Sequence, residues 1–105
     1  MRSKLKLVVN NKFKKKEKFF VKNELRSILN LYAKKVSAGD WKDYGLSINK
    51  KEISFDIYQR ASEKPIYRIS KNLNPKRKDE RFFILDKNGN IIKRSEDLET
   101  LIRRV

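Results

Sequence analysis

The chain has 105 residues, and its 28 lysines and arginines against 13 acidic residues give a formal charge of +15 at pH 7. It contains neither cysteine nor histidine, which excludes disulfides, zinc sites of the Cys/His kind, and thiol or imidazole catalysis. The length suits one domain with one modest core, and the apolar runs are too short to span a bilayer. We therefore expect a soluble, cytoplasmic protein that is not an enzyme and holds no metal or cofactor.

The positive charge indicates a polyanionic partner, because the like charges of so small a protein repel one another unless an anion neutralises them. Nucleic acid is the partner that we favour, and no membrane is expected. A genome rich in A and T also inflates Lys and Asn without any function. The sequence therefore leaves an alternative open, a protein-interaction or assembly module whose high charge is compositional.

Residues 1–22 are predicted to form a basic N-terminal arm, and residues 23–105 a compact α+β domain. The arm holds nine basic residues and one acid, Glu17. Blocks of like charge often act as tails that bind nucleic acid. The arm residues that we assign to this role are Lys12, Lys14, Lys15, Lys16 and Lys18.

A first helix is predicted from Asn23, as N-cap, to about Ala38. Its apolar residues recur at helical spacing, and Gly39 follows as a terminator. We expect a polar link over residues 40–45, without regular structure. Residues 53–58 then alternate between apolar and polar, the period of a half-buried strand.

A second strand is predicted over residues 66–70, followed by a loop from Lys71 to Glu80. The segments 81–86 and 90–93 flank Asn88-Gly89, a pair that accepts the positive φ angles of a tight primed turn. A final helix is expected to begin at Ser95 as N-cap. The predicted order is a helix, a three- or four-stranded antiparallel sheet and a C-terminal helix.

Basic residues surround both predicted strand pairs. If the strands form a meander, these side chains can share one sheet face with Tyr58, Tyr67 and Phe82, which would suit a surface that tracks a phosphate backbone and stacks bases. The loop cluster Lys76-Arg77-Lys78 is placed to reach phosphates. Within the domain, the residues predicted to bind nucleic acid are Arg60, Arg68, Lys71, Lys76, Arg77, Lys78, Lys93 and Arg94.

Structured or ribosomal RNA is favoured over DNA. A long basic arm is typical of proteins threaded into folded RNA, and the aromatic residues interleaved with basic ones suit unpaired bases. Neither predicted helix has a face that is basic from end to end, as a helix inserted into the major groove would need. A protein partner is the alternative to nucleic acid.

An ordered succession of short blocks runs from about Phe19 to the C-terminus. The blocks are Phe20, Glu24-Leu25, Ile28-Leu29, Tyr32, Val36, residues 38–44, 55–60, 62–71 and 89–94, and Asp97-Leu98. Together they resemble an alphaproteobacterial family of domains of unknown function, number two-seven-nine-four. The resemblance implies a single compact intracellular domain and carries no activity.

Overall fold

The structure, a computed structural model, describes residues 19–60, 64–103 and 105. The prediction of an α+β fold, with one helix before the sheet in the chain and one after it, is confirmed. The sheet has five strands and not three or four. In chain order the elements are α1 (Lys22–Ser37), β2 (Asp43–Ile48), β3 (Glu52–Tyr58), β4 (Tyr67–Asn72), the 3-10 turn η2 (Lys78–Glu80), β5 (Phe82–Asp86), β6 (Ile91–Ser95) and α2 (Leu98–Ile102).

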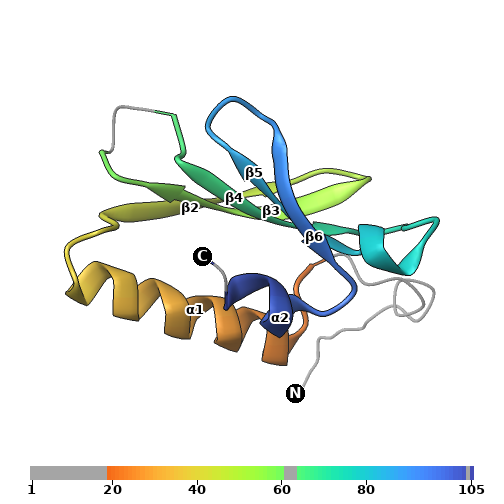
Figure 1. The fold of residues 1–105 in the computed structure, drawn as a ribbon, viewed down its shortest axis with the longest axis horizontal. Coiled ribbons are helices and arrows are strands. Elements are labelled where there is room, and N and C mark those ends of the chain that lie inside the picture. The colour runs from red at the N-terminus through yellow and green to blue at the C-terminus, as the bar shows by residue number, and fades with distance from the viewer. Residues whose placement is uncertain (1–18, 61–63, 104) are drawn as a thin grey trace, which may run out of the picture.

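The sheet is an antiparallel meander in the order β2-β3-β4-β5-β6. Both helices lie on the same face of it, and no helix of the described residues lies over the opposite face (Figure 1). The alternation of β3 explains this arrangement, because Ile53, Phe55 and Ile57 are fully buried in the core beneath the helices. We call the two sides of the sheet the helix face and the open face.

The first helix begins slightly earlier than predicted. Val21 and not Asn23 occupies the N-cap position, and its N–H donates to the Glu24 carboxylate at 2.8 Å. Glu24, at position N3, thus supplies the half of a capping box in which a side chain inside the helix accepts from the N–H of the N-cap residue. Phe20 is also buried in the core, so packing reaches three residues before the predicted boundary at residue 23.

The expected polar link over residues 40–45 is wrong, because the first half of β2 lies there. Tyr44 and Leu46 lie opposite Ile57 and Phe55 across the β2–β3 pair, and the Tyr44 ring stacks on Phe55 with centroids 4.7 Å apart. The alternation of Tyr44 and Leu46 with Gly45 is present in the sequence, but glycine is depleted in strands and is typical of loops.

The Asn88-Gly89 hairpin is confirmed, but its turn has three residues instead of two. The Gly89 N–H donates to the Asp86 carbonyl at 3.0 Å, and the Asp86 N–H donates to the Asn90 carbonyl at 2.9 Å. Gly89 has φ +85°, as expected for a type I turn closed by one left-handed residue. Of the glycines, Gly89 in this turn and Gly39 after α1 (φ +84°) have positive φ.

The C-terminal helix begins later than predicted. Ser95 is the last residue of β6, and Asp97 is the N-cap of α2. The Asp97 carboxylate accepts from the Thr100 hydroxyl at 2.7 Å and from the Thr100 N–H at 3.2 Å. These hydrogen bonds lower the pKa of Asp97, the one from the Thr100 side chain having the largest effect. The helix buries Leu98 and Leu101.

Candidate nucleic-acid interface

The connection between β4 and β5 gathers basic side chains around a depression of about 300 Å³. Lys76, Arg77, Lys78 and Arg81 line it, together with Pro75 and Glu96. Pro75 breaks the extended chain, and η2 folds the next residues back towards β5. The three residues predicted from the sequence are therefore brought together, with a fourth cation beside them. We call this group the basic loop.

Arg77 is oriented by its own neighbours. Its Nε lies 3.3 Å from the Asp79 carboxylate and 3.5 Å from that of Glu80. Both the guanidinium and Asp79 are well exposed, so these ion pairs contribute little stability and a phosphate can compete with them. Arg81 is held differently, with its guanidinium 5.6 Å from the centre of the Phe82 ring.

The open face of the sheet carries a row of basic and aromatic side chains. Phe83 lies opposite Ser70 on one side and Arg94 on the other, and Arg68 is in the adjacent row. Arg68 and Arg94 are exposed, whereas Phe83 is half-buried. An aromatic ring between guanidinium groups can stack a base while the cations meet phosphates.

Two aromatic residues expected on this face are not there. Tyr67 and Phe82 pack against the core on the helix face, which is the position that their alternation with Arg68 and Phe83 requires. Tyr58, the third expected aromatic, follows Asp56 by two residues in β3 and shares the open face with it. Phe83 was not predicted to lie on this face. Its alternation with the core residues Phe82 and Ile84 would have placed it there.

A carboxylate is buried on the open face. Asp56 is 3% exposed and accepts hydrogen bonds from Ser54 at 2.7 Å and Ser47 at 2.6 Å. The Arg68 Nε lies 3.8 Å from the same carboxylate. Asp56 thus orients Arg68 from below, and its own charge is largely compensated before a phosphate approaches.

Two predicted binding residues lie on the other side of the sheet. Lys71 is 2% exposed, and its Nζ donates to Glu24 at 2.8 Å and to the Phe19 carbonyl at 3.2 Å. Lys93 lies opposite the core residue Ile84 and so faces the helices as well. Lys71 anchors α1 and is out of reach of an external ligand.

The remaining predicted residues are Arg60 and the five lysines of the basic arm. Arg60 is exposed just beyond the end of β3. Lys12, Lys14, Lys15, Lys16 and Lys18 lie outside the residues that the structure describes. The basic loop and the pair Arg68 and Arg94 are therefore the parts of the predicted site that can be located.

Comparison with known proteins gives one match, to the sequence model of a family described as "Protein of unknown function (DUF2794)", over residues 18–102. The chain belongs to this family. No curated protein and no solved structure matches it. The match to DUF2794 includes the basic loop and the open face but begins after most of the basic arm.

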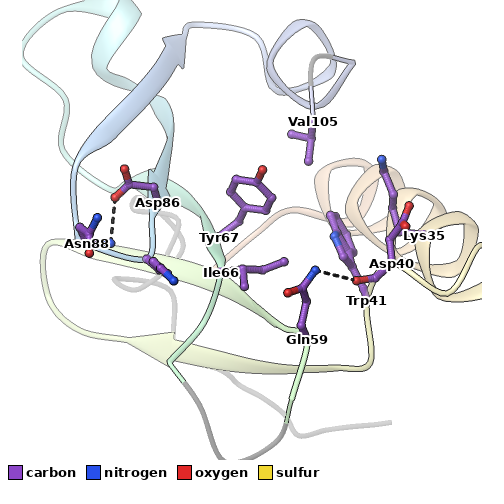
Figure 2. Close-up of a pocket in the computed structure, with 10 residues that line it drawn as sticks. Lys35, Asp40, Trp41, Gln59, Ile66, Tyr67, Asp86, Asn88 and Val105 are labelled. Atoms are coloured by element: carbon purple, nitrogen blue, oxygen red, sulfur yellow. Dashed lines mark hydrogen bonds between the residues drawn. The ribbon is translucent and has the colours of Figure 1, made fainter.

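A larger depression of about 560 Å³ lies at the opposite end of the sheet from the basic loop in this DUF2794 chain. Trp41, Ile66 and Tyr67 line it, with Lys35, Asp40 and Asp86 around them (Figure 2). Lys87 also lines it. Asp86 is already engaged, because its side chain accepts from the Asn88 and Asn90 N–H groups. With two lysines balanced by two aspartates, the depression favours no charge class of ligand.

Within the part of the chain that the structure describes, no group of three or more carboxylates is placed to hold a metal ion. No helix there has both the length and the apolar character needed to cross a membrane.

Proposed function

We propose that this protein binds nucleic acid mainly through phosphate contacts, with structured or ribosomal RNA preferred over DNA. The observation that carries the proposal is the basic loop, where four cations line one small depression together with one carboxylate, Glu96. Two further acids of the loop, Asp79 and Glu80, pair with the exposed Arg77. Loop cations of this kind fix a nucleic acid in place without reading its sequence. The formal charge of +15 adds long-range attraction.

The open face supports the same proposal. Arg94 lies in β6 two residues before Glu96, which lines the basic loop, and it lies opposite Phe83. A strand held at the basic loop can extend over Phe83 and place an unpaired base on its ring. This arrangement favours RNA with single-stranded or looped regions.

The preference over duplex DNA rests on the helices. α2 has five residues and an acidic start, with Asp97 as N-cap and Glu99 in the first turn. α1 has its buried side against the sheet, and its C-terminal turn alone carries adjacent lysines, Lys34 and Lys35. Neither helix offers the continuous basic face with which proteins enter the major groove.

A charge-neutralised loop tests the proposal. Replacing Lys76→Gln and Lys78→Gln together should weaken binding to an RNA hairpin about tenfold near physiological salt, and should flatten the log-log salt slope by roughly 1.4 to 1.8 units, since two phosphate contacts are lost. Fluorescence anisotropy at several salt concentrations measures both quantities. A DNA duplex of the same sequence serves as the competing ligand.

The matched control is Lys64→Gln with Lys87→Gln, which removes the same charge from exposed positions at the opposite end of the sheet. This control should keep most of the affinity. Equal losses in the two double variants would show that net charge alone attracts the ligand. Binding of the wild-type chain that does not weaken with salt would overturn the proposal.

A further inference from the structure

A group of exposed apolar side chains lies at one edge of the sheet. Five of the large hydrophobic side chains that remain exposed come from this edge, and two of them, Leu46 and Ile48, are 46% and 62% exposed. We call the five the apolar edge: Leu29 and Val36 from α1, and Tyr44, Leu46 and Ile48 from β2. Proteins rarely leave so much apolar surface on an outer strand in contact with water.

These side chains face the same way. Tyr44, Leu46 and Ile48 lie opposite the buried residues of β3 and so share the helix face with them. The Tyr32 ring of α1 contacts the Tyr44 ring, with centroids 5.0 Å apart. Leu29 and Val36 are one turn before and one turn after Tyr32 and therefore flank the same seam between α1 and β2.

The backbone N–H and C=O groups of Tyr44, Leu46 and Ile48 are directed away from the sheet. Among the described strands, β2 pairs with β3 alone. The Asn49 N–H donates to the Glu52 carbonyl at 3.0 Å, and this bond sets the alternation of the ladder. Residues 43, 45 and 47 then direct their N–H and C=O groups to β3, while Tyr44, Leu46 and Ile48 direct theirs away from the sheet.

We propose that the apolar edge binds a second copy of this chain, with the two β2 strands paired antiparallel about a two-fold axis at Leu46. The helix faces of both chains lie on the same side of the joined sheet only if the two-fold axis is perpendicular to the sheet. Such an axis places one residue of β2 opposite the same residue of the second chain. Leu46 then meets its own copy, and Tyr44 meets the second copy's Ile48, an aromatic and β-branched pair. The result is one continuous sheet of ten strands from two chains.

The size of the surface fits this partner. Five such side chains offer on the order of 500 Å² per copy, so two copies bury about 1,000 Å², the lower limit for a specific interface. A C2 contact uses the same patch twice, which a self-complementary strand supplies.

The charge of each copy opposes association, so salt should strengthen the dimer by screening. Binding to nucleic acid has the opposite salt dependence.

Sedimentation velocity of the nuclease-treated wild-type chain, at low salt and at high salt, measures the dimer directly. We expect a monomer–dimer equilibrium that shifts towards the dimer as salt increases. Leu46→Lys places two like charges at the axis and should leave a monomer. Ile91→Lys is the matched control, because Ile91 is 50% exposed on β6, the other edge of the sheet, and this variant should dimerise normally.

A cross-link tests the register. The chain has no cysteine, and directly opposed residues of a hydrogen-bonded pair have Cα atoms about 5.5 Å apart, within the range of a disulfide. Leu46→Cys should therefore form a covalent dimer under mild oxidation, whereas Ile91→Cys should not. Circular dichroism confirms that each variant is folded.

A wild-type chain that stays monomeric at both salt concentrations would overturn the proposal, and so would equal behaviour of the two Lys variants or of the two Cys variants. Nucleic-acid affinity is measured on the same proteins. Leu46→Lys should still bind RNA, so loss of the dimer and loss of the proposed function are separate outcomes.

Discussion

The Lys71 ammonium group lies 2.8 Å from the Glu24 carboxylate, between β4 and the first turn of α1. The lysine is buried, and the same carboxylate oxygen of Glu24 also accepts from the Val21 N–H. One carboxylate thus caps the helix and joins it to the sheet. The sequence predicts that Lys71 binds a ligand, but its positive charge stabilises the contact between α1 and the sheet.

Lys71→Met should destabilise the protein by about 3 kcal/mol or more, because it leaves the largely buried Glu24 carboxylate without its counter-ion. Urea denaturation measures the loss. Lys93→Met, on the same face but in the edge strand β6, should cost less. Adding Glu24→Gln to Lys71→Met should recover part of the stability, and a single Lys71→Met variant as stable as the wild type would contradict the assignment.

Gly89→Val should lower the free energy of unfolding by more than about 1 kcal/mol, since a β-branched residue is forced to positive φ. A Cβ at this position meets no atom within 4 Å, so the cost comes from the backbone and not from a clash. Gly89→Asn should be milder, because Asn tolerates the left-handed region. Thermal denaturation of the two variants side by side measures the difference, and equal stability would argue against a positive φ.

The Asp97 cap predicts a dependence of stability on pH. Its pKa is lowered in the folded state from an ordinary value of 3.8, so the charged cap contributes fully above that value and is lost as the pH falls through the folded pKa. The melting temperature of the wild type should therefore fall more between pH 6 and pH 3 than that of Asp97→Asn, which keeps an acceptor but does not titrate. Thr100→Val, which removes the hydroxyl donor, should also reduce this dependence.

Deleting residues 1–18 removes eight basic residues and one acid. If half of these cations meet phosphates, RNA affinity should fall on the order of tenfold to a thousandfold, and the log-log salt slope should flatten by about three to four units. Anisotropy titrations with the full chain as reference measure both. An unchanged slope would remove the arm from the interface and leave the basic loop to be tested by its own variants.

The sequence predicted the elements whose pattern is strong. Ile28 and its neighbours recur at helical spacing, and Asn88-Gly89 separates two apolar runs, so α1 and the last hairpin were placed within a few residues. The start of α1 was misplaced because its cap comes from Glu24 inside the helix. β2 was missed although Tyr44, Leu46 and Ile48 alternate with Gly45 and Ser47, because glycine is depleted in strands and Gly45 was assigned to a loop.

The sequence predicted which residue types form the candidate site better than it predicted which face of the sheet each residue occupies. Arg68 and Lys71 are three residues apart in one strand, and an odd separation places them on opposite faces. Counting that separation would have assigned Lys71 to the helix face with Ile69. Its partner Glu24 could not have been inferred, because the contact depends on how α1 crosses the sheet. The association of Arg81 with the basic loop likewise depends on the fold of η2.

The order of the strands has a consequence for the folding rate. Each strand is hydrogen-bonded to its neighbour in the chain, so the sheet closes mostly over short connections and at a small entropic cost. The Glu24–Lys71 contact instead joins residues 47 positions apart. We expect the meander to form first and α1 to dock after the transition state. Kinetically, Lys71→Met should then accelerate unfolding and leave the refolding rate almost unchanged.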